Sequence, residues 1–162
     1  MKAMLIVLTL ICAGCGGGSP MNPSVAIPGA DLSGKWDGPV TVKGCAGTEA
    51  LAFLCNASPY ATVGSAAPAS LHLYQKGILL GGTAGIDGIV SDVFTSGAVS
   101  GSRLGFTATA RPGQGITLQT TWSLRIASAS TLTGTVKQVW TVDGALGEVV
   151  IDSTVSVVKV GS

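Results

Sequence analysis

The side chains that could do acid–base chemistry are few in this chain. One in ten of its 162 residues is charged, and it holds a single histidine, His72. A Ser-His-Asp hydrolase would have to use His72 as its base. His72 alternates with Leu71 and Leu73, a pattern typical of the polar face of a strand. We therefore interpret it as an exposed strand residue and expect no enzymatic activity, with a hydrolase as the remaining alternative.

Two carboxylates, Asp87 and Asp92, are near enough in sequence to be considered as a glycosidase pair. Such a pair needs a separation of roughly 5–9.5 Å. Asp87 precedes Gly88 and fits a tight turn instead, while Asp92 fits a solvated position. The chain also lacks the phosphate-binding and nucleophile-elbow glycine motifs. We expect no catalytic residues and no cofactor.

Two of the four cysteines, Cys12 and Cys15, belong to an N-terminal segment typical of an export signal. Lys2 is followed by residues 3–13, which are apolar except for Thr9. This matches a charged n-region and an apolar h-region of roughly 7–15 residues. A spanning helix needs about 20 apolar residues, and glycines and a proline interrupt this run first.

The sequence Cys-Ala-Gly-Cys at positions 12–15 resembles the lipobox of bacterial lipoproteins. The resemblance implies a signal peptide over residues 1–14 and a diacylglycerol on the sulfur of Cys15, with a further acyl chain such as palmitate on its amine. More than one chain gives stable anchoring, because each buried CH₂ contributes about 0.8 kcal/mol. The lipobox usually has leucine or a similar aliphatic residue where Cys12 stands.

The residue after Cys15 is Gly16 rather than the aspartate that favours inner-membrane retention in enteric lipoproteins. The expected location is therefore the cell envelope, at the outer membrane. An ordinary secreted protein cleaved near Gly14 is the alternative.

Residues 15–30 are expected to form a lipid-anchored tether, because residues 16–30 contain four glycines, three prolines and no charge. Residues 31–162 are long enough for one domain. The chain has nine Lys and Arg against eight Asp and Glu, and Lys2 belongs to the signal, so this domain is neutral. Neutrality excludes a nucleic-acid partner bound through net charge.

The domain alternates apolar and polar residues with a period of two, which indicates half-buried antiparallel strands. In residues 116–126, for example, Leu118, Trp122 and Leu124 share one face. Turn sequences such as Asp87-Gly88 and Asp143-Gly144 separate the runs. We expect strands near 33–43, 49–55, 69–75, 78–86, 89–99, 103–110, 116–126, 131–142 and 146–159.

Short connections between these strands predict an all-β, antiparallel up-and-down meander that closes into a barrel of about eight strands. A two-sheet β-sandwich is the alternative. Residues 56–69 are uncharged and lack a period, so we expect a long loop over one barrel end.

The remaining cysteines, Cys45 and Cys55, lie within the domain. A zinc site would need more soft ligands than two cysteines and one distant histidine, so no metal site is expected. In an exported chain these thiols should form a disulfide, and closing so short a loop contributes roughly 3 kcal/mol on the chain-entropy model.

The sequence Leu-Ser-Gly-Lys-Trp at positions 32–36 resembles the first strand of two barrel families, the lipocalins and the avidins. The lipocalin resemblance implies that Trp36 plugs one barrel end beneath a basic residue of the last strand, here Lys159. The avidin pattern wants asparagine and serine where this chain has Gly38 and Val42, so biotin binding is not expected.

A barrel of eight strands either fills its interior with side chains or holds one small ligand. By alternation, the candidate pocket-lining residues are Trp122, Trp140, Gln138, Thr120 and Gln75. Apolar walls with a few polar groups suit a small-molecule pocket. A filled core is the alternative for the same residues.

These sequence features support two alternative hypotheses about function. The first is a non-enzymatic envelope lipoprotein whose barrel binds a small apolar ligand or a protein partner. The second is a barrel resembling the small proteinase inhibitors, in which the loop at 56–69 or the N-terminal tether would enter the protease cleft. A purely structural envelope role has no sequence signature. A hollow interior favours the first function, whereas a filled interior with a projecting loop favours the second.

Overall fold

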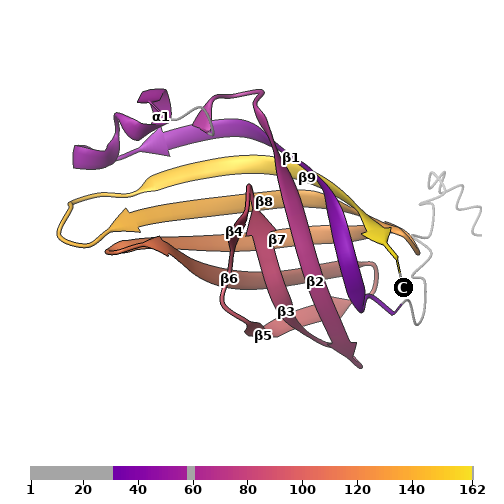
Figure 1. The fold of residues 1–162 in the computed structure, drawn as a ribbon. Helices are drawn as coiled ribbons and strands as arrows, with labels where there is room; N and C mark the ends of the chain where they lie inside the picture. The colour runs from indigo at the N-terminus through magenta and orange to yellow at the C-terminus, as the bar shows by residue number, and fades with distance from the viewer. Residues whose placement is uncertain (1–30, 58–60, 162) are drawn as a thin grey trace, which may run out of the picture.

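The computed structural model describes residues 31–57 and 61–161 (Figure 1). The expected signal peptide, Cys15 and the tether lie outside these residues. The chain forms strands and two short helical segments in this order: β1 (Gly34–Gly47), a 3₁₀ turn η1 (Glu49–Leu51), α1 (Leu54–Ala57), β2 (Ala66–Lys76), β3 (Leu79–Ile86), β4 (Ile89–Val90), β5 (Phe94–Ser100), β6 (Arg103–Gly113), β7 (Ile116–Ser128), β8 (Thr131–Val142) and β9 (Val149–Val160).

Eight of these strands hydrogen-bond in a closed antiparallel ring. Each pairs with the next along the chain, β5 follows β3 directly in the ring, and β1 pairs with β9 to complete it. The two-residue β4 pairs only with the end of β3. The predicted up-and-down barrel is confirmed and the sandwich alternative is not, although the strands are not spaced evenly round an axis.

Period-two alternation determines which side chains fill the barrel. Along β7 the inward residues Leu118, Thr120, Trp122 and Leu124 are buried, and the alternate residues from Gln119 to Arg125 are exposed. The outward face is polar, so water can solvate the outside while apolar side chains meet inside. Among the described residues, no helix is long and apolar enough to cross a membrane.

Inward glycines mark the tight bends of the ring. A Cβ on Gly38 would lie 2.1 Å from the backbone oxygen of Ser156, and one on Gly134 would lie 2.1 Å from that of Ser123. A neighbouring strand therefore crosses where a side chain would otherwise be. Glycine at such corners lets a closed barrel curve sharply.

One end of the barrel is packed solid, and we call it the closed end. It holds the start of β1, the end of β9 and the turn between β2 and β3. The main core of buried residues extends from this end and includes Trp36, Leu73, Phe106 and Trp122.

The opposite, open end carries α1 and the turn between β8 and β9 (Figure 1). A second, smaller cluster gathers there from five buried residues: Val42, Leu51, Ala61, Val149 and Ile151. The space between the two clusters is where a site can form.

The expected strand at 49–55 is wrong. These residues instead form η1 and the start of α1. Alanine and leucine favour helix in this run, and β1 itself extends to Gly47, beyond the predicted end at 43. The segment thereby turns back over the open end.

Two further element boundaries and one turn differ from expectation. The expected strand at 89–99 is broken between β4 and β5, where the Ser91 hydroxyl accepts the Ala84 N–H that a ladder partner would take. The expected loop at 56–69 is shorter, because Ala66–Lys76 form β2. Asp87 and Gly88 both have positive φ, as predicted for a primed turn, but at the second predicted turn Gly144 alone does.

Candidate ligand-binding cavity at the open end

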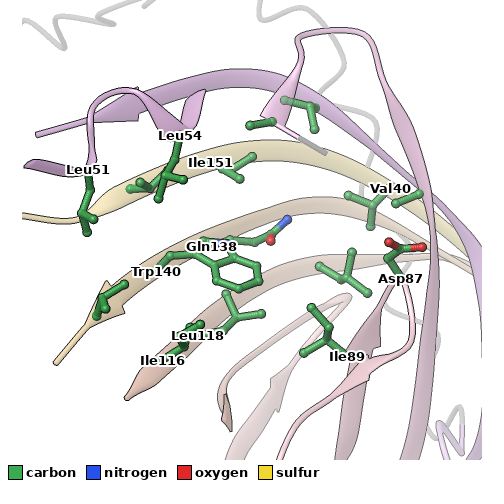
Figure 2. Close-up of a pocket in the computed structure, with 16 residues that line it drawn as sticks. Val40, Leu51, Leu54, Asp87, Ile89, Ile116, Leu118, Gln138, Trp140 and Ile151 are labelled. Atoms are coloured by element: carbon green, nitrogen blue, oxygen red, sulfur yellow. The ribbon is translucent and has the colours of Figure 1, made fainter. Parts of the chain in front are cut away.

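A cavity of about 300 Å³ occupies the open end of the barrel (Figure 2). Its walls come from β1, β7, β8 and β9, and its cover comes from the segment between β1 and β2 and the turn between β3 and β4. The lining residues are Val40, Val42, Leu51, Leu54, Ala61, Ala67, Ile86, Asp87, Ile89, Ile116, Leu118, Gln138, Trp140, Val142, Val149 and Ile151.

The lining is apolar except for Gln138 and Asp87. Small-molecule sites are typically clefts of roughly 300–1,000 Å³ with apolar walls and a few polar groups. The size and composition of this cavity suit one small apolar ligand. Among the lining residues there is no lysine, arginine or histidine, and the Asp87 carboxylate adds negative charge, so an uncharged ligand is favoured over an anionic one.

Gln138 is the polar group inside the cavity. It is 5% exposed and lies on β8 directly opposite Thr120 of β7. Thr120 is satisfied, because its hydroxyl donates to the Ala108 carbonyl and accepts from Trp122 Nε1. No hydrogen bond joins the Gln138 amide to another described residue, and Figure 2 shows the amide between the apolar walls. An amide placed this way can donate to or accept from a ligand.

Two further polar atoms lie buried near the cavity without a partner among the described residues. They are Nε1 of Trp140 and Oγ of Ser153. Trp140 lines the cavity, and Ser153 stands opposite Val42, another lining residue. Buried polar groups without partners are uncommon and destabilising. Both lie toward the open end rather than in the packed core.

The predicted disulfide between Cys45 and Cys55 is confirmed, with Cα atoms 5.7 Å apart. It joins β1 to α1 and so fixes the segment that carries Leu51 and Leu54 over the cavity. The same cover is tied to the turn before β9 at Thr48, which exchanges hydrogen bonds with Glu148.

The five candidate pocket residues separate into two groups. Gln138 and Trp140 line the cavity, but Trp122, Thr120 and Gln75 do not. Trp122 stacks on Phe106 at 5.7 Å and belongs to the packed core. Alternation correctly placed these side chains inward, but it carries no information on depth along the barrel.

Gln75 lies at the closed end. Its Oε1 accepts from the Leu32 N–H and its Nε2 donates to the Gly77 carbonyl. It therefore holds the chain before β1 against the turn between β2 and β3, far from the cavity.

Trp36 and Lys159 meet at the closed end. Trp36 is fully buried and its Nε1 donates to the Leu32 carbonyl. Lys159 Nζ lies 5.6 Å from the centroid of the Trp36 ring and donates to the Asp31 carbonyl. Hydrogen bonds from Ser33 lower the pKa of the Asp31 carboxyl, so it stays charged beside this lysine.

The residues considered for catalysis are dispersed. His72 is exposed on β2, and Asp92 forms an ion pair with Arg111. Asp87 sits in its turn at the cavity rim. Within residues 31–57 and 61–161, no three histidine, cysteine or acidic side chains gather as a metal site would require.

Sequence reasoning missed the cover of the cavity. Leu51 and Leu54 were assigned to a strand, and only the disulfide and the switch to helix place them over the open end. The wall residues, such as Leu118 and Ile151, were on the predicted inward face.

No protein-family model, no curated protein and no solved structure matches this chain, so its function has to be argued from the cavity itself.

Proposed function

We propose that this protein is a lipid-anchored lipoprotein of the cell envelope, located at the outer membrane, whose barrel binds one small, uncharged, largely apolar ligand. The observation that carries the proposal is the apolar cavity of about 300 Å³ at the open end. A fully packed barrel would have gained stability by filling this space, because each unfilled volume costs packing energy. The buried amide of Gln138 supports a ligand with one hydrogen-bonding group.

The placement of the chain ends supports this reading. Lys35 pairs with Val160, so the first described residues and the C-terminal strand end share the closed end (Figure 1). An anchor at Cys15 would attach there through the tether. The cavity would then open away from the membrane, toward the aqueous phase.

The proteinase-inhibitor alternative is less well supported. An inhibitory loop has to project, whereas Ala61 is buried and lines the cavity, and Ala66 begins a strand of the ring. Within the described part of the segment expected to form this loop, Ala61 and Ala67 line the cavity, and the exposed stretch is limited to the turn around Val63.

A pair of neighbouring alanines on β2 tests the proposal. Ala67 lines the cavity, whereas Ala66 is exposed on the opposite face. Ala67→Trp should fill the cavity, and Ala66→Trp should place the same ring in water. The readout is the fluorescence of N-phenyl-1-naphthylamine, an uncharged apolar dye that brightens in apolar sites.

We expect the unmodified chain and Ala66→Trp to bind the dye equally, and Ala67→Trp to lose at least tenfold in affinity. Circular dichroism of both variants verifies that the ring of strands is intact. Equal dye binding by a folded Ala67→Trp variant, or no binding by the unmodified chain, would overturn the cavity as a ligand site.

A further inference from the structure

The charged side chains are balanced in number but sorted along the barrel. The turns of the open end carry acidic residues, Asp87, Asp143 and Glu148. Basic residues gather toward the closed end, at the start of β1, the end of β2, the start of β6, the last part of β7 and the end of β9: Lys35, Lys76, Arg103, Arg125 and Lys159. The described acidic residues at that end are two, Asp31 and Asp37, so cations are in excess there. The domain is neutral as a whole, but its closed end is basic.

Two of these cations face each other directly. Arg103 of β6 and Arg125 of β7 are register partners, and both are exposed on the outer face. Like charges opposite each other on adjacent strands are destabilising. Among the described residues, the ion pair within 4 Å is Arg111 with Asp92, so neither of these two arginines has an acidic partner there. By contrast, Lys137 stands opposite Asp152.

The arginine pair lies in a surface groove between β5 and β8. Gly105 is exposed and places no side chain in its floor, and the hydroxyl residues Ser100, Ser123 and Thr133 line it with the two arginines. Guanidinium groups match the geometry of phosphate oxygens, and hydroxyls add donors. The groove thus offers a phosphate group two cations that have no acidic partner among the described residues.

Exposed apolar residues lie beside this groove at the same end. Ile78, in the turn before β3, and Leu79, the first residue of β3, are 70% and 58% exposed. Leu79 pairs with Ala98 of β5, and Ala98 pairs with Gly105 of the groove. A large aliphatic pair next to cations is typical of surfaces that contact both the acyl region and the headgroups of a bilayer.

We propose that the closed end docks on a bilayer that contains anionic phospholipid, with a headgroup phosphate held between Arg103 and Arg125 and with Ile78 and Leu79 in the interfacial region. The chain enters β1 at this same end. The docking surface is separate from the cavity, and it would orient the barrel with the open end away from the lipid. It does not depend on the cavity holding a ligand.

Vesicle binding by the full chain carrying Cys15→Ser tests this surface, because that chain has no acyl group at residue 15. Co-sedimentation is compared between vesicles of phosphatidylcholine alone and vesicles of equal parts phosphatidylglycerol and phosphatidylcholine. The readout is the ratio of the two affinities, compared between variants, because the N-terminal segment with Lys2 is the same in all of them. The arginine variant is the double substitution Arg103→Gln/Arg125→Gln. Its control, the lysine variant Lys43→Gln/Lys137→Gln, removes two positive charges outside the groove.

We expect the unmodified barrel to bind the anionic vesicles more tightly than the neutral ones. The ratio of the two affinities should fall about tenfold in the arginine variant and stay unchanged in the lysine control. The arginine variant should melt at the same or a higher temperature, since a like-charge contact is removed.

The double variant Ile78→Ser/Leu79→Ser should weaken binding to both vesicle types. Inorganic phosphate at matched ionic strength should compete only weakly; strong competition would instead assign the groove to free phosphate and overturn the docking surface. Equal binding to both vesicle types, or equal losses in the arginine and lysine variants, would also overturn it.

Discussion

At the scale of single residues, the account depends most on Gln138. Its amide is buried, stands next to a fully satisfied Thr120, and has no hydrogen bond to the described chain. The amide faces an apolar cavity, so exchanging it for an apolar side chain should cost the ligand-free protein little, whereas a ligand would lose its hydrogen-bond partner. Its removal should therefore lower ligand affinity without lowering stability.

Gln138→Leu should leave the free energy of unfolding unchanged or raise it by up to about 1 kcal/mol. The same change should weaken competition by 1-octanol for the bound dye about fivefold, because the alcohol loses its hydrogen-bond partner. Urea unfolding and dye displacement measure the two effects. Gln119→Leu, on the exposed face of β7, is the control and should change neither. A destabilised Gln138→Leu variant would mean that the amide is satisfied within the protein.

At the scale of elements, the barrel depends on strands crossing closely at inward glycines. Gly38 and Gly44 both lie in β1, yet a Cβ on Gly38 would meet the Ser156 oxygen, whereas one on Gly44 would meet nothing within 4 Å. Gly38→Ala should lower the free energy of unfolding by about 2–3 kcal/mol, and Gly44→Ala should be close to neutral. Thermal unfolding of the two variants compares them directly, and equal melting temperatures would contradict the close crossing of β1 and β9.

The cover of the cavity depends on the disulfide. Replacing Cys45 and Cys55 together by alanine should cost about 3 kcal/mol, since the bond closes a loop with a sequence separation of 10. Leu51 and Leu54 should then be held less firmly, and dye release should become faster. Urea unfolding with and without reductant checks the first effect. Reductant should destabilise the unmodified chain and leave the double variant unaffected; an unmodified chain insensitive to reductant would argue against the bond.

The elements were predictable from the sequence to different degrees. Period-two alternation predicted the strands and their inward faces, because a half-buried strand must alternate wherever it lies, and the short connections predicted their order in the ring. The strand prediction over residues 49–55 is wrong, because a disulfide and packing on the open end hold this segment in η1 and the start of α1. Local sequence also does not reveal that Ser91 interrupts the ladder before β5.

The site was only partly predictable. Alternation identified Gln138 and Trp140 as inward residues, and both line the cavity. It gave the same prediction for Trp122, which stacks in the core, because the height of a residue along the barrel depends on strand stagger. Whether an inward position meets another side chain or empty space is decided by residues on several strands at once.

At the scale of the whole molecule, the two ends of the barrel differ in packing and in charge. The closed end is solid and basic, and the open end is hollow and acidic. An anchor at Cys15 would hold the closed end near the membrane. Cys15→Ser should therefore move the protein out of the tightly held membrane fraction while leaving the barrel folded.

Extraction of membranes with high salt and alkaline carbonate measures that change, and circular dichroism of the released protein verifies the fold. Cys12→Ser is the matched control and should remain anchored. A Cys15→Ser protein that resists extraction as the unmodified protein does would reject the lipid anchor.

Intact mass of the protein purified from its own membranes tests the central claim most directly. Under denaturing conditions, we expect the mass of a chain that begins at Cys15, increased by its acyl groups. Under native conditions, we expect one further small molecule per chain, absent from the Ala67→Trp variant and present in Ala66→Trp. A native mass equal to the denatured mass, or an added molecule that persists in Ala67→Trp, would contradict a ligand held in the cavity of the open end.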